Sequence, residues 1–295
     1  MSAPTGPTAL PEGLRARVLE RSLGRRPAGR ATPEPPEITP VEALGRAARS
    51  MTTLLGELTE DQWRRTALRG LDVQGLVGHL IGVESDLQRV LAGDAHPSIL
   101  DHIGSTQPAA EGQAGRPGRA TQDAWTEAVT ESIRALAAAD PQARITLHGA
   151  RLSVSELCIA RTFELWTHEN DIRGALGLAA TQPDASTLTL MTRLATDLLV
   201  RVVSRSGIAG QDRPLTLRLV LTGPGGGTWQ LTSGEPAAAP ASAFTTTAVG
   251  IVADAVQFCR LVANRTTPAA LEAHVTGDPG AAEAVLRMAT TLALD

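Results

Sequence analysis

The chain has 295 residues, a hydrophobic fraction of 42%, a net charge of −4, and neither lysine nor tyrosine. Its length favours two domains with a substantial core. No arginine-rich stripe alternates with aromatic residues, which argues against nucleic-acid binding, and no run of about 18 apolar residues could span a membrane. The start lacks a signal-peptide pattern, and Cys158 and Cys259 lie far apart. We therefore expect a cytoplasmic protein with two buried free thiols.

The first 38 residues are dominated by proline, glycine and arginine. One short amphipathic piece, from Leu14 to Leu23, is compatible with a helix. The remainder has the composition of a linker. We therefore predict that residues 1–38 form an extension that precedes the folded domains.

Residues 39–185 are predicted to form an antiparallel four-helix bundle. Thr39 opens a capping box, with proline at the first helical position and glutamate three residues after the threonine. Asp72 caps a second helix, which ends near Gly93, and a third helix carries Trp125. A second capping box at Ser153 opens a fourth helix that runs to about residue 177. The connection over residues 94–120, rich in Gly, Pro, Gln and Arg, is predicted to be a long and functional loop.

Residues 186–295 are predicted to form a small α+β domain, which makes the whole chain α+β. The glycine-rich stretch 223–227 lacks the Lys-Ser/Thr of a phosphate-binding loop, so we interpret it as a hairpin turn. The expected elements are a helix at Leu188–Val203, strands at Leu215–Leu221 and Thr228–Leu231, a weaker strand at Phe244–Val249, a helix at Ile251–Ala263, a strand at Leu271–Val275 and a helix from Pro279.

Three potential metal donors occur on two of the predicted helices. Glu164 and His168 are four residues apart and therefore share one helix face. That pair alone is a weak signal, and a lone His79 between core residues is typical of a satisfied core histidine. Together the three match the His₂Glu set of a catalytic zinc site, which keeps a fourth position open. Glycines on the second helix suggest space beside His79: Gly75, Gly78 and Gly82.

The stretches 71–80 (LDVQGLVGHL) and 163–171 (FELWTHEND) resemble the mycothiol-dependent maleylpyruvate isomerase family of DinB-like metalloproteins. The resemblance covers nearly all of residues 39–295, with a sterol-carrier-like C-terminal domain. It implies that His79, Glu164 and His168 bind a divalent metal such as Zn²⁺, that mycothiol is the thiol cosubstrate, and that an arginine of the C-terminal domain is catalytic. The best match for that arginine is Arg265. An actinobacterial source is compatible with a chain whose basic residues are all arginine.

A thiol that enters the open position of such a metal loses its proton and becomes a nucleophile. We expect a zinc-dependent enzyme that uses this metal-bound thiolate for S-transfer or thiol exchange on a small electrophile. Cis–trans isomerisation of the maleylpyruvate type is the alternative. The N-terminal extension and the 94–120 loop both depart from the family, and transfer is favoured because the changed loop suggests another substrate. A metal-dependent hydrolase and a non-catalytic metal-binding module stay open, and the expected assembly is a monomer or a weak homodimer.

Other polar residues receive less specific interpretations. Asp171 is expected either to hydrogen-bond a ligand histidine or to lie on the helix surface. Arg116 and Arg119 either receive an anionic substrate or are solvated. The remaining histidines in or near predicted loops are expected to be solvated: His96, His102 and His148.

Overall fold

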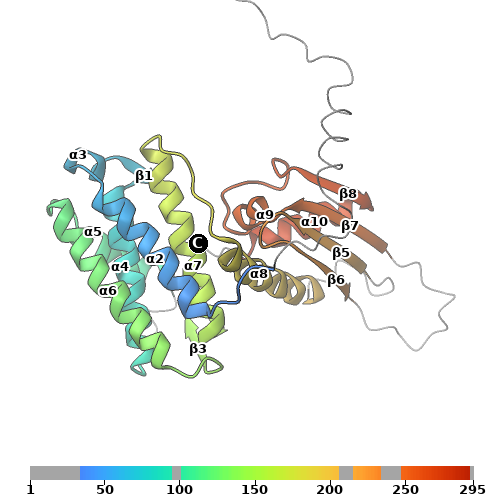
Figure 1. The fold of residues 1–295 in the computed structure, drawn as a ribbon, viewed down its shortest axis with the longest axis horizontal. Coiled ribbons are helices and arrows are strands. Elements are labelled where there is room, and N and C mark those ends of the chain that lie inside the picture. Colours follow the sequence, from blue (N-terminus) through green and yellow to red (C-terminus); the bar gives the residue numbers. More distant parts are fainter. Residues whose placement is uncertain (1–33, 95–100, 206–214, 234–246, 293–295) are drawn as a thin grey trace, which may run out of the picture. The chain divides into compact units, whose positions relative to one another are not determined.

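The computed structural model describes residues 34–94, 101–205, 215–233 and 247–292 (Figure 1). Residues from Glu37 onward belong to one compact unit. The helix predicted at Leu14–Leu23 lies outside the described residues. None of the described helices is both long enough and apolar enough to cross a membrane.

Helices α2, α4, α6 and α7 form the predicted bundle, with α2 packed on α6 and α7, and α4 packed on α6. The helix starts agree with the sequence signals: the capping boxes at Thr39 and Ser153 are both present, and the Asp72 side chain accepts a hydrogen bond from the backbone N–H of Gly75. The helices of this part of the chain are α2 (Pro40–Gly56), α3 (Glu60–Trp63), α4 (Val73–Leu91), α5 (His102–Gly112), α6 (Gly118–Ala138) and α7 (Val154–Ala175).

The prediction of a long loop over residues 94–120 is wrong. Helix α5 occupies much of this segment, capped by Asp101, and α6 begins at Gly118. Helix α5 has little amphipathic character and contains Pro108, which explains why its sequence reads as a loop. It packs against α4 along its length, so tertiary contacts stabilise a helix that local sequence disfavours.

Two short hairpins connect the bundle helices. Strand β1 (Thr66–Leu68) pairs with β2 (Leu71–Asp72), and β3 (Arg144–Leu147) pairs with β4 (Ala150–Ser153). His148 and Gly149 form the two-residue turn of the second hairpin, and both have positive φ. This is the arrangement of a type I′ turn, whose twist matches that of the strands it joins.

The C-terminal part contains a four-stranded sheet in the order β6-β5-β7-β8, with β5 and β7 parallel and the other pairs antiparallel. The helix predicted at Ile251–Ala263 is wrong in its first four residues. Residues 251–254 end strand β7, and Asp254 then caps α9. The elements are α8 (Ala185–Arg205), β5 (Leu215–Thr222), β6 (Gly227–Ser233), β7 (Thr247–Asp254), α9 (Ala255–Val262), β8 (Ala273–Gly277) and α10 (Pro279–Thr290).

The described residues contain two large hydrophobic clusters, and the predicted α+β class is confirmed. One cluster lies within the bundle. The other spans the sheet, α8, α9 and α10, and also includes Phe163 and Trp166 of α7. Because α7 contributes to both clusters, the helix that carries Glu164 and His168 is fixed by packing from both of them.

Candidate metal centre

The structure brings the three predicted donors together. His79 on α4 and Glu164 and His168 on α7 each offer one ligand atom, and these atoms all lie within 4.8 Å of one another. All three residues are buried. The Nε2 atom of His79 lies 3.5 Å from Oε1 of Glu164. Burial lowers the pKa of His79, which favours the neutral imidazole that binds metals.

Each of the two histidines is oriented through its Nδ1 atom. Nδ1 of His79 lies 2.8 Å from Oγ1 of Thr106 on α5, and Nδ1 of His168 lies 3.0 Å from Oδ2 of Asp171. Of the two alternatives expected for Asp171, the structure shows the contact with a histidine, His168. Hydrogen bonds of this kind hold the other ring nitrogen, Nε2, toward a metal.

Asp171 in turn contacts Arg265, which follows α9. Nε and Nη2 of Arg265 donate to the two carboxylate oxygens of Asp171 at 2.8 and 2.7 Å. Asn264 has a positive φ, and the backbone N–H of Arg265 donates to the carbonyl of Arg260, a Schellman-type helix end that turns Arg265 back toward α7. Burial alone would raise the pKa of Asp171, but the hydrogen bonds from His168 and Arg265 hold it below its ordinary value.

Glu164 belongs to a buried charge cluster. Arg161 donates one hydrogen bond to Oε2 of Glu164 and another, at 2.6 Å, to Glu84 on α4. Burial alone would raise the pKa of Glu164, yet the Arg161 guanidinium holds it well below its ordinary value. The carboxylate is therefore ionised, and its Oε1 atom faces the histidines.

The fit of a metal to these residues rests on atoms that lack partners. Oε1 of Glu164 and Nε2 of His168 are both buried, and neither has a hydrogen-bond partner within the described part of the chain. Buried polar atoms are normally paired, so such atoms need an explanation. Imidazole nitrogen and carboxylate oxygen are ligands that zinc accepts, and the site fits a divalent cation.

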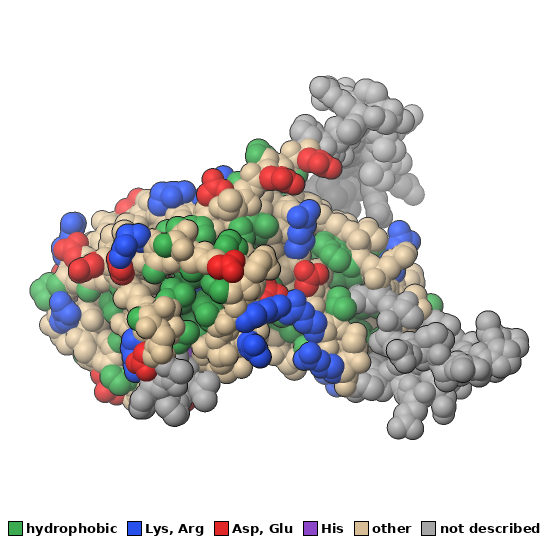
Figure 2. Space-filling view, turned by 90° about the horizontal axis from the view of Figure 1, so that it is seen from below, with side chains coloured by type: hydrophobic (Ala, Val, Ile, Leu, Met, Phe, Trp, Pro, Cys, Tyr) green, Lys and Arg blue, Asp and Glu red, His purple; other side chains and the backbone are tan. Residues whose placement is uncertain are grey.

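The expectation that His102 and His148 are solvated is wrong. The His102 ring lies 4.9 Å from that of His79 and stacks on that of His148 at 4.3 Å. Nε2 of His148 lies 3.0 Å from Oδ2 of Asp86. The hairpin turn at His148 and Gly149 is a local signal that could have indicated the position of His148. The position of His102 could not be predicted, because it requires helix α5, which the sequence did not indicate. Almost no histidine colour is visible on the face shown in Figure 2, and His79 and His168 are buried. His96 lies outside the described residues.

The glycines of α4 do not provide empty space beside His79. A Cβ atom at Gly78 would lie 2.7 Å from Cα of Ala110, and one at Gly82 would lie 2.8 Å from Cα of Thr106. These glycines therefore allow the backbone of α5 to approach α4 closely. The close approach brings Thr106 within hydrogen-bonding distance of His79.

Several other predicted residues lie outside the cluster. Cys158 and Cys259 are buried and free as expected, and burial raises the pKa of Cys158 to about 12. Arg119 pairs with Asp123 on the α6 surface, and the backbone carbonyl of Arg116 accepts a hydrogen bond from Gln74. The catalytic role of Arg265 stays a prediction.

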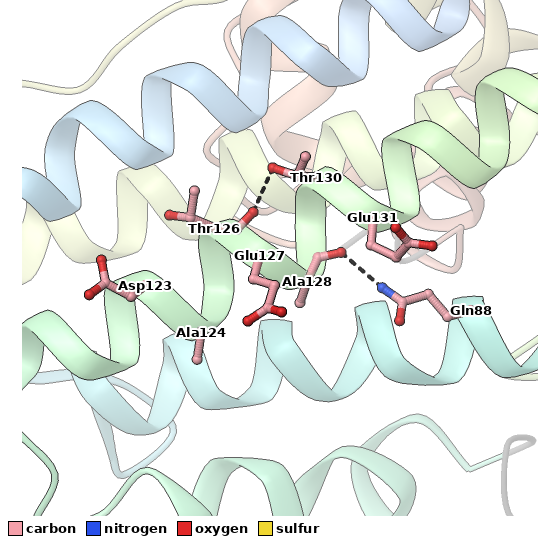
Figure 3. Close-up of a pocket in the computed structure, with 8 residues that line it drawn as sticks. All are labelled: Gln88, Asp123, Ala124, Thr126, Glu127, Ala128, Thr130 and Glu131. Atoms are coloured by element: carbon pink, nitrogen blue, oxygen red, sulfur yellow. Dashed lines mark hydrogen bonds between the residues drawn. The ribbon is translucent and has the colours of Figure 1, made fainter.

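Two cavities of the described structure can be compared with the position of the three donors. The larger, about 780 Å³, lies on the outer face of α6 beside Gln88 and contains none of the three donors (Figure 3). The smaller, about 170 Å³, is lined by residues of α7 and α9 and includes Asp171, Arg260 and Arg265. The smaller cavity is thus adjacent to the residues that orient His168.

Comparisons with known proteins give a family match for part of the chain and structures with the same fold. Residues 44–173 match the family model described as the mycothiol maleylpyruvate isomerase N-terminal domain. Two crystal structures share the fold: the mycothiol-dependent maleylpyruvate isomerase, at 14% identity and a TM-score of 0.52, and its histidine-to-alanine mutant, at 13% identity and a TM-score of 0.54. Each comparison covers 79% of this chain and 91% of the other. No curated protein matches the sequence. The family match therefore covers residues 44–173, the segment that contains His79, Glu164 and His168.

Proposed function

We propose that this chain binds one zinc ion through His79, Glu164 and His168 and catalyses a mycothiol-dependent cis–trans isomerisation. The observation that carries this proposal is the convergence of three donor atoms within 4.8 Å. They lie inside the segment that matches a mycothiol maleylpyruvate isomerase domain. Two nitrogens and one carboxylate oxygen are the donor set of catalytic zinc sites that keep a position for a substrate.

When bound there, the cation lowers the pKa of an entering thiol and so supplies a nucleophile at neutral pH. The chain's own residues prepare the site. Thr106 and Asp171 fix the two imidazole rings, and Arg161 fixes the carboxylate of Glu164. The thiol has to come from solution, because Cys158 and Cys259 are buried and burial raises the pKa of both.

Isomerisation is favoured over S-transfer on two grounds. The preference for transfer depended on a long loop at residues 94–120, and helix α5 occupies much of that segment. The solved structures that share the fold are named as an isomerase. In an isomerisation the thiol adds to a conjugated double bond, rotation follows about the resulting single bond, and elimination restores the alkene and the thiol. In a transfer the new C–S bond persists and the thiol is consumed.

The test is turnover of maleylpyruvate by the zinc-loaded full chain with and without mycothiol. We expect cis–trans conversion that saturates with mycothiol while the total thiol concentration stays constant. Substitution of both cysteines by serine should leave this thiol dependence intact. Stoichiometric loss of thiol would show transfer instead, and turnover in thiol-free buffer would favour a hydrolase.

A further inference from the structure

We infer that His102 supplies a fourth protein donor to the same cation, which extends the His₂Glu set to His₃Glu. This inference rests on the metal site proposed above. It adds a residue from α5, whereas the three proposed ligands lie on α4 and α7. It concerns the first turn of α5, directly after the capping residue Asp101.

The position of His102 relative to Glu164 matches that of a ligand. Nε2 of His102 lies 3.6 Å from Oε1 of Glu164, and Nε2 of His79 lies 3.5 Å from the same oxygen. In a tetrahedral site with bonds of about 2.0–2.1 Å, neighbouring donor atoms are roughly 3.3 Å apart. Both histidines are therefore within a few tenths of an ångström of that spacing from Glu164.

The second observation is that Nε2 of His102 is buried and has no hydrogen-bond partner among the described residues. Oε1 of Glu164 and Nε2 of His168 share this condition. Three unpaired buried atoms of metal-binding side chains thus belong to one cluster, and two of them come from the proposed ligands. The donor atoms of the three proposed ligands lie within 4.8 Å of one another, and Nε2 of His102 adjoins them through Oε1 of Glu164. A cation bound to that oxygen would account for the unpaired Nε2 of His102 as well.

The surrounding structure holds His102 in this place. The backbone carbonyl of His102 accepts a hydrogen bond from Oγ1 of Thr106, the residue that contacts Nδ1 of His79. On its other side, the His102 ring stacks on His148 with an interplanar angle of 13°. His148 is fixed in turn by Asp86. The same turn of α5 therefore orients one ligand and presents another.

A fourth protein donor has a chemical consequence. Four donors fill a tetrahedral zinc site, whereas catalytic sites with three protein donors keep a position for water or substrate. With His102 bound, a thiol has to displace one donor or add as a fifth ligand. The side chain of His102 is 27% exposed, more than those of the three proposed ligands, which makes it the donor best placed to leave.

The inference can be tested on the purified full chain by zinc affinity in competition with a chelator and by the absorption spectrum of the Co²⁺-substituted protein. We expect His102→Ala to weaken zinc binding by about tenfold or more and to change the Co²⁺ spectrum. Ile103→Ala is the matched control, because Ile103 is the exposed neighbour in the same turn; it should change neither. Thermal unfolding of the metal-free variants checks that α5 is retained.

The outcome also separates this inference from the proposed function. If His79→Ala loses zinc while His102→Ala keeps the wild-type affinity and Co²⁺ spectrum, the fourth donor is refuted and the three-donor site stands. If His79→Ala also keeps full affinity, the proposed metal site itself is wrong.

Discussion

Arg265, in the chain segment after α9, holds both carboxylate oxygens of Asp171, and one of those oxygens also contacts Nδ1 of His168. A residue of the C-terminal part is thereby linked through one carboxylate to His168, a proposed metal ligand on α7. From this contact we expect Arg265 to act as a positioning residue through Asp171.

Replacing Arg265 should weaken the metal site, because Asp171 would lose two charge-assisted hydrogen bonds that fix it against His168. We expect Arg265→Met to lower zinc affinity or turnover by about 10–100-fold. Chelator competition and steady-state kinetics measure the two effects. Arg260→Met is the matched control, since Arg260 lines the same small cavity. Equal effects of the two substitutions would contradict the link through Asp171.

Arg161 should be the most costly charge in the bundle to remove, because it lies buried between Glu84 and Glu164. Arg161→Met leaves two buried carboxylates uncompensated, and we expect it to lower the free energy of unfolding by about 3–5 kcal/mol. Urea unfolding of the metal-free protein gives this value. The exposed Arg119, paired with Asp123, is the control, and Arg119→Met should change stability little. A loss no larger than that of the control would refute the buried cluster.

Gly82 should not tolerate a side chain, because a Cβ atom there meets the backbone of Thr106. We expect Gly82→Ala to destabilise the protein by about 1–3 kcal/mol and to weaken zinc binding, since α5 has to move away from His79. Gly174→Ala on α7 is the control. A Cβ atom at Gly174 has no neighbour within 4 Å, so this change should be neutral or stabilise by up to about 1 kcal/mol. Wild-type stability and affinity in Gly82→Ala would disprove the close packing.

Glu156 should contribute to stability in a pH-dependent way. Burial alone would raise its pKa, but the backbone N–H of Ser153 and the guanidinium of Arg201 lower it. A carboxyl whose pKa is lower in the folded state stabilises the protein above its unfolded pKa, about 4.3, and loses that contribution as the pH falls through the folded value. We therefore expect Glu156→Gln to be less stable than wild type at pH 7, with the difference shrinking below pH about 4. A constant difference from pH 7 to pH 3 would contradict this assignment.

The helix starts of the bundle could be predicted because capping is a local signal. The side chains of Thr39, Asp72 and Ser153 each cap the helix that follows them. The spacing of Glu164 and His168 likewise placed both side chains on one face of α7 without knowledge of the fold.

The parts that were missed depend on contacts between distant segments. Helix α5 packs against α4 because Gly78 and Gly82 have no side chain and leave room for its backbone. No pattern within residues 102–112 indicates this packing. The last residues of β7 pair with β5 in parallel, and the short apolar run 251–253 could not be distinguished from the start of a helix by its own periodicity. The sequence did not reveal the position of His102 for the same reason, because His102 reaches Glu164 only when α5 packs against α4.

The central claim is that one divalent cation binds to His79, Glu164 and His168. Equilibrium dialysis of the full chain against buffered zinc, followed by elemental analysis, tests it most directly, with His274→Ala as a control for loss of an exposed imidazole. We expect one equivalent of zinc in wild type and in the control, and far less than one in His79→Ala and His168→Ala at the same free zinc concentration. A full equivalent retained in both of these variants, with the fold intact by circular dichroism, would contradict it.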